Sequence, residues 1–205
     1  MEALQTMQYR GHKVEIYYDS DSDSPRHWDN IAEFHCCHRR YSLGDKTYTS
    51  GQECREAAQV AQKQGDIVLP LYLYDHSGIT ISLTPFSCPW DSGQIGYCIV
   101  RRNTMLKEFH AKKRTPSLKD KAIQLAQGEV KTYDQYLRGE VFGYVVDVFE
   151  GFSCWGYYDI QECIDEAKLS VDYMVQKQMQ GHCQKLKQWI LNKVLFQYRY
   201  ASNEQ

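Results

Sequence analysis

Four side chains suited to acid–base or nucleophilic chemistry occur in two neighbouring polar segments of the chain. Asp75 and His76 lie in the first segment, and Cys88 and Asp91 lie in the second. A cysteine, a histidine and an aspartate can form a nucleophile, its base and an orienting group, as in a hydrolase. With Asp29, the two aspartates could instead hold Mg²⁺ for phosphoryl chemistry. In the simpler alternative these residues cap turns or pack in the core, so no catalytic residue is assigned.

A second set of aspartates has the spacing of a calcium-binding loop. Asp19, Asp21 and Asp23 match the first, third and fifth positions of an EF-hand, whose carboxylates bind Ca²⁺. The match then ends, because the sixth position is Ser24 and the twelfth is Asn30. We therefore expect a solvated acidic loop and assign no metal there.

The segment 35–38 (HCCH) contains the residue types that bind zinc. It belongs to an apolar run that predicts a strand, in which adjacent side chains point to opposite faces. Two of these residues at most could therefore share one ion, with the others supplied by Cys88 or Cys154. The chain has no CxxC, HExxH, GxSxG or phosphate-binding glycine loop, so we expect no cofactor.

The sheet predicted for residues 69–100 would determine where Asp75, His76, Cys88 and Asp91 lie. The apolar run Leu69–Tyr74 predicts a buried strand, and Ile79–Leu83 predicts a second strand joined to it by a short glycine-containing loop. Pro85 and Pro89 exclude a central strand from the segment that follows. This arrangement would bring all four side chains to one end of the sheet.

The segment between the two prolines is a candidate binding loop. The prolines make it stiff, Trp90 directly follows the second of them, and stiff loops on a sheet are common locations for sites. Arg39 and Arg40 follow a predicted strand, and Trp155 follows another. We expect these four side chains to be neighbours that contribute to binding.

Other segments complete an α+β fold. Further strands are predicted at 8–18, where Gly11 could divide two short strands, and at 31–38, 140–149 and 152–158. Helices are predicted at 51–65, 101–114, 116–126, 129–137, 160–179 and 182–198. We expect one mostly antiparallel sheet of about five to seven strands, with helices on one face and a C-terminal pair of helices separated at Gly181. Residues 1–180 would form a single domain, and residues 181–205 a helical extension.

Composition narrows the class of protein. The chain has 205 residues, a net charge of -2 and eight cysteines, which have no spacing typical of secreted disulfide frameworks. It has neither an apolar run near ~20 residues nor a signal peptide, so we expect a cytoplasmic protein with reduced cysteines and no membrane contact.

Six sequence motifs occur together in this chain: SPRHWDN, HRRYSLGD, LPLYLYDHSGIT, FSCPWDSGQIGY, GEVKTYDQYLRGEVFGYV and SCWGYY. As a set they resemble a family of small proteins encoded by bacteriophages and other mobile elements. The resemblance covers Gln8–Met179, so the helix from His182 onward is an addition to the common pattern. It implies a bacterial host cell and a protein that binds and blocks a host or defence protein, as anti-restriction and anti-CRISPR inhibitors do.

Protein binding also agrees with the aromatic composition. The chain contains sixteen tyrosines and four tryptophans, residue types that are enriched at interfaces. Many of these tyrosines could instead pack on the faces of the sheet, because tyrosine has a high β-strand propensity. The helix predicted at 182–198 could bind a partner, form a homodimer or pack on the sheet.

Nucleic-acid binding is the remaining alternative. Lys112, Lys113 and Arg114 form a basic cluster that could contact phosphates, together with other paired arginines. The slightly negative net charge disfavours this hypothesis, because charge runs are commonly solvated faces.

Overall fold

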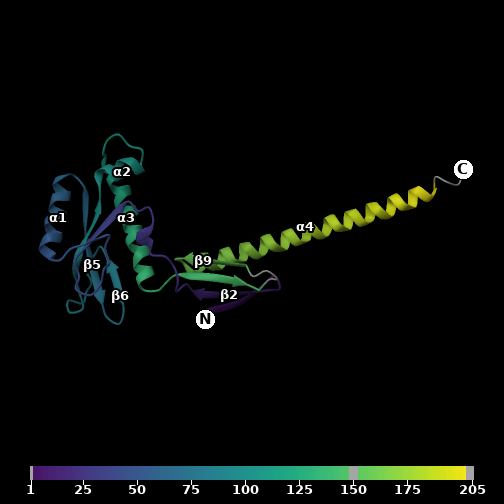
Figure 1. The fold of residues 1–205 in the computed structure, drawn as a ribbon, viewed down its shortest axis with the longest axis horizontal. Helices are drawn as coiled ribbons and strands as arrows, with labels where there is room; N and C mark the ends of the chain where they lie inside the picture. Colours follow the sequence, from purple (N-terminus) through teal and green to yellow (C-terminus); the bar gives the residue numbers. More distant parts are fainter. Residues whose placement is uncertain (1, 148–151, 202–205) are drawn as a thin grey trace. The chain divides into compact units, whose positions relative to one another are not determined.

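The computed structural model describes residues 2–147 and 152–201, with residues 194–201 described by their backbone only (Figure 1). Its strands are β1 (Gln5–Tyr9), β2 (His12–Tyr18), β3 (Ala32–Cys36), β4 (Lys46–Thr47), β5 (Ile67–Asp75), β6 (Ile79–Ser82), β7 (Ser92–Val100), β8 (Phe142–Val146) and β9 (Phe152–Tyr157). Its helices are α1 (Gly51–Lys63), α2 (Arg102–Glu108), α3 (Pro116–Leu137) and α4 (Ile160–Ala201). The last residues of the predicted strand 140–149 and of the predicted extension 181–205 lie outside the described residues.

The chain divides into two compact units. The first, here the meander unit, consists of residues 1–18 and 142–205, and the second, here the inserted unit, consists of residues 19–141. A hydrogen bond joins the two ends of the inserted unit, where the Asp19 N–H donates to the Val141 carbonyl over 2.8 Å. The boundary expected at residue 181 lies inside α4 and does not separate these units.

The inserted unit contains a five-stranded sheet with the order β4-β3-β7-β5-β6. Its pairs are antiparallel except for β3 with β4. Phe34 and Cys36 of β3 pack in the core cluster that includes α3, whereas the Sγ of Cys54 in α1 donates to the backbone carbonyl of His35. Helices α1 and α3 therefore cover opposite faces of the sheet (Figure 1), and the expectation of helices on one face was wrong.

Local sequence signals explain the helices of the inserted unit. The Ser50 hydroxyl accepts from the Glu53 N–H at the start of α1, over 3.2 Å, as the capping pattern predicts. Thr115 caps α3 in the same way, and Pro116 occupies its first turn. Helix α2 is shorter than predicted, since His110 soon after its end has φ +48°.

The meander unit is an antiparallel sheet with the order β1-β2-β8-β9, covered by the first half of α4. Arg10 and Gly11 have positive φ and form the turn between β1 and β2, so residues 8–18 form two strands, one of the two forms predicted. The expected pair of C-terminal helices is one continuous helix. Glycine at position 181 lowers helix stability by only about 1 kcal/mol and keeps its backbone N–H, so it need not end the helix.

The α+β class and the mostly antiparallel pairing are thus confirmed, with two sheets where one was expected. The sequence pattern identifies strands but not their partners. Strands β2 and β8 are adjacent in the sheet although the whole inserted unit separates them in the chain.

Candidate functional site

One end of the five-stranded sheet brings three loops together, and we call this surface the loop end. It consists of residues 37–45, 76–78 and 83–91, which follow β3, β5 and β6. Strand β5 ends at this point, and Ser92 at the start of β7 pairs with Tyr74. Because β3 is antiparallel to β7, the residues after β3 emerge at the same end.

The four side chains predicted to converge do lie together at the loop end. The Asp75 N–H donates to the Asp91 carbonyl over 2.8 Å, and His76 Nδ1 lies 3.1 Å from Asp91 Oδ2. The Cys88 thiol donates to the same Asp91 oxygen over 3.9 Å. Arg40 forms an ion pair with the Asp75 carboxylate. Asp91 is therefore the shared acceptor of the cluster.

The arrangement of Cys88, Asp91 and His76 does not match the active site of a cysteine hydrolase. A thiol nucleophile requires a base that removes its proton, and the base requires a carboxylate on its far side. Here the Asp91 carboxylate lies between Cys88 and His76, and in the described part of the chain no hydrogen bond joins the thiol to the imidazole.

Stacked rings hold the loops in place. Tyr74 lies between His76 and Phe86, with ring centroids 5.9 Å and 5.6 Å away. His38 stacks on Tyr41 at 5.0 Å with the ring planes 4° apart. Each contact joins a loop residue to the end of a strand or to the same loop, so the loop end is a braced surface.

The most exposed large apolar side chain at the loop end is Trp90, at 91%. Arg39 and Arg40 are also exposed, and the Arg40 guanidinium lies 5.3 Å from the centre of the Tyr41 ring. Three of the four predicted binding neighbours thus belong to this surface. The fourth, Trp155, belongs to the meander unit, where it packs at 6.2 Å from Tyr17.

Arg26, from the motif SPRHWDN, connects three parts of the inserted unit. Its side chain is 8% exposed and donates to both carboxylate oxygens of Asp45, over 2.6 Å and 3.2 Å. It also donates to the Ala32 carbonyl and lies 3.8 Å from the centre of the Phe34 ring. Glu129 accepts from the backbone N–H groups at the start of β3. Arg26, Asp45 and Glu129, all from these motifs, therefore stabilise the fold.

Sequence reasoning missed a second polar cluster on the α1 face of the sheet. Glu33 Oε2 accepts from Lys46 Nζ at 2.9 Å, His35 Nε2 at 3.1 Å and Arg101 at 3.2 Å. The His35 Nε2 must carry the proton, because a carboxylate can only accept, so Nδ1 accepts from the Tyr48 hydroxyl over 2.8 Å. The sequence placed His35 in a predicted strand but gave no signal for these partners, which come from other segments of the chain.

Burial and hydrogen bonding set the protonation of this cluster. Burial opposes ionisation of Glu33, but the hydrogen bonds from Lys46, His35 and Arg101 outweigh it and lower its pKa to about 2. Burial lowers the pKa of His35 more than Glu33 raises it. The cluster therefore holds an ionised carboxylate beside a neutral imidazole.

Two of the residues considered as metal ligands, Asp19 and Cys36, have other structural roles. Asp19 accepts from the backbone N–H of Asp21 over 3.2 Å and forms a turn. Cys36 packs in the core, where burial raises its pKa to about 12. Among the described residues, no group of three or more His, Cys, Asp or Glu side chains could hold a metal ion.

The basic cluster at residues 112–114 lies in the loop after α2. Lys112 and Lys113 are exposed, and Arg114 donates to the Gly65 carbonyl over 2.8 Å. One of the three predicted phosphate-binding side chains is therefore engaged in a contact within the inserted unit.

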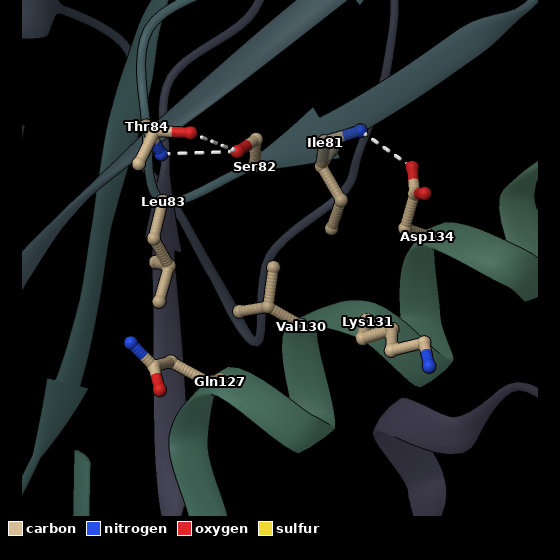
Figure 2. A pocket seen from close by; sticks show the side chains of 8 residues that line it. All are labelled: Ile81, Ser82, Leu83, Thr84, Gln127, Val130, Lys131 and Asp134. Carbon is tan, nitrogen blue, oxygen red and sulfur yellow. Dashed lines mark hydrogen bonds between the residues drawn. The ribbon is translucent and has the colours of Figure 1, made fainter. Parts of the chain in front are cut away.

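A shallow pocket of about 270 Å³ lies between β6 and α3, and none of the predicted site residues lines it (Figure 2). Its lining includes Ile81, Val130 and Lys131. The Asp134 carboxylate accepts from the Ile81 N–H over 2.8 Å, so this helix caps one backbone donor of the sheet's edge strand. We assign the contact to edge protection.

No family model, curated protein or solved structure matches this chain. The resemblance to phage-encoded proteins thus stays a prediction from the six motifs. No helix in the described ranges has the length and hydropathy that a membrane span requires.

Proposed function

We propose that this chain is an accessory protein of a bacteriophage or mobile element that binds and inhibits a host or defence protein in the bacterial cell. The loop end is the proposed binding surface. The observation that carries the proposal is Trp90, 91% exposed on a braced loop. Tryptophan and arginine dominate the binding energy of protein interfaces, and a braced loop loses little conformational entropy on binding.

The surroundings of Trp90 support this proposal. The loop end also carries exposed charged side chains of both signs, with Arg39 and Arg40 on one loop and Asp91 on the same loop as Trp90. A central aromatic group with a polar rim is the usual anatomy of a protein–protein interface. The two alternatives have less support: a hydrolase would need Cys88 and His76 in contact, and nucleic-acid binding would rely on a cluster in which Arg114 is already engaged.

The test is capture of a partner from bacterial lysate with the tagged full-length chain, followed by mass spectrometry. We expect one stoichiometric protein, at least about tenfold less of it with Trp90→Ala, and an unchanged amount with the control Leu125→Ala. Leu125 is a suitable control because it is an exposed apolar residue on α3. The captured protein should also lose its activity when the chain is added.

Two results would overturn the proposal. If the column retains nothing, or only nucleic acid that nuclease and salt remove, the chain does not bind an abundant host protein. If Trp90→Ala captures as much partner as the unmodified chain, the loop end is not the binding surface.

A further inference from the structure

Helix α4 continues well past the sheet that it covers. Cys163, Ala167 and Val171 are fully buried against the meander sheet. From residue 176 to Lys193, by contrast, every described side chain is exposed, apart from the partly exposed Gly181. Figure 1 shows this part of α4 projecting beyond the strands of its unit. A lone helix of this length is marginally stable in water, so this half has a reason to acquire a partner.

The projecting half carries a narrow apolar stripe, which we call the seam. It consists of Met179, Cys183, Leu186 and Ile190, all exposed. Their spacings alternate between four and three residues, the pattern with which one helix packs against another. At 3.6 residues per turn, the four side chains fall within roughly 60° of the helix surface. The seam itself has the width of a helix–helix contact, and Trp189 and Leu191 are further exposed apolar side chains on either side of it.

The seam is not a continuation of the face that packs on the meander sheet. That face is centred near Ala167, and the seam is rotated from it by roughly 110° around the helix axis. Strands that cover the first half of α4 would therefore not cover the seam even if the sheet were longer.

Charge identifies the kind of partner. The projecting half carries Lys177, Lys185, Lys187 and Lys193, and no aspartate or glutamate occurs between residues 173 and 203. In a pair of identical helices these lysines would have no acidic residues to face. At 3.6 residues per turn, Lys187 and Lys193 flank the seam, whereas Lys177 and Lys185 lie on the far side of the helix. A surface with acidic side chains beside an apolar stripe complements the seam together with Lys187 and Lys193.

We infer that residues 177–193 of α4 form a second interaction surface, which docks an acidic amphipathic helix of another protein along the seam. This goes beyond the proposed function, because the surface lies in the meander unit and does not use Trp90. Docking in this way would place the partner's apolar residues against Leu186 and Ile190 and its carboxylates beside the flanking lysines.

The test uses the full-length chain and two fluorescein-labelled peptides, read by fluorescence anisotropy. Both peptides carry Ile and Leu at the two core positions of a heptad repeat, one with Glu and the other with Lys at the flanking positions. We expect the Glu peptide to bind, more weakly as salt is raised, and the Lys peptide to bind at least about tenfold more weakly. The double variant Leu186→Gln with Ile190→Gln should lose about tenfold or more in affinity for the Glu peptide.

The matched control is Leu191→Gln, because Leu191 is equally exposed but lies off the seam. It should bind the Glu peptide within about twofold of the unmodified chain. Equal binding of both peptides, or full binding by the double variant, would overturn the inference. So would a dimer in sedimentation equilibrium that the double variant abolishes, since a second copy would then occupy the seam. Binding to vesicles of anionic phospholipid that the double variant abolishes would assign the seam to a membrane instead. Loss of partner capture by Trp90→Ala would leave this test unaffected.

Discussion

Charged residues of the inserted unit fall into two groups, which the sequence does not separate. Arg26 and Glu129 lie beneath the surface and fasten the loop before β3, whereas Arg39 and Arg40 are exposed at the loop end. All four occur in the six motifs described above. A motif residue can therefore matter for folding or for binding, and the exposed fraction of its side chain distinguishes the two.

Glu33 leads to a prediction about pH. Its pKa falls from 4.5 in the unfolded chain to about 2 in the folded state. Between these two pH values, the carboxylate is therefore ionised in the folded state and protonated in the unfolded state. The stabilisation is complete above pH 4.5 and is lost as pH falls through about 2. Glu33→Gln should lower the free energy of unfolding by on the order of 1 kcal/mol at pH 7, after allowance for solvent screening. Urea unfolding followed by circular dichroism would measure this difference.

The difference between Glu33→Gln and the unmodified chain should shrink steadily between pH 4.5 and about 2. Glu108→Gln serves as the control, since Glu108 is an exposed carboxylate on α2 and its loss should change little. A constant difference across this pH range would show that the hydrogen bonds to Glu33 do not depend on its charge.

At the scale of elements, β7 is the strand on which the inserted unit depends. It pairs with both β3 and β5, and its side chains enter both faces of the sheet. Gly96 is the closest point of this pairing, because a Cβ at that position would lie 1.9 Å from the His35 carbonyl oxygen. The three nearest atoms are all backbone atoms of β3, which cannot move aside as the end of a flexible side chain could.

Gly96→Ala should therefore destabilise the inserted unit by about 2 kcal/mol or more. Gly93→Ala, in the same strand, should have a far smaller effect, because a Cβ there meets nothing within 4 Å. Comparing the urea midpoints of the two variants tests this directly. Equal midpoints would mean that β3 and β7 can separate without cost at this position.

At the scale of the whole molecule, each unit has its own core. The cluster around Phe34 and Tyr133 lies within residues 19–141, and the cluster around Ile16 and Val171 lies within the meander unit. The two ends of the inserted unit are joined by the hydrogen bond between Asp19 and Val141. Insertion between two adjacent strands is compatible with separate folding when the ends of the insert lie this close.

Residues 19–141 expressed alone should therefore fold. We expect one cooperative urea transition by circular dichroism, with a slope of roughly 1–3 kcal/mol/M. The same fragment with Gly96→Ala should unfold at lower urea, which links the transition to the native sheet. A gradual, non-cooperative loss of signal would show that the inserted unit needs the meander unit to fold.

The sequence by itself determined the local structure of this protein. Ser50 and Thr115 cap helices through side-chain bonds to residues three positions away, and the alternation in β3 places His35 and Cys36 on opposite faces. It also predicted that Asp75 and Asp91 would meet, since the strands that carry them are close in the chain. These features depend on short-range interactions, which sequence patterns record directly.

Only the tertiary structure decided the rest. Two sheets form because β2 pairs with β8 across the inserted unit, and strand patterns do not specify such distant partners. The partners of Arg26 and Glu33 come from separate loops and strands, so their role required the folded chain. The position of Asp91 between Cys88 and His76 was also visible only in the folded structure. The sequence predicted that these three residues would be close together, but not which of them would lie between the other two.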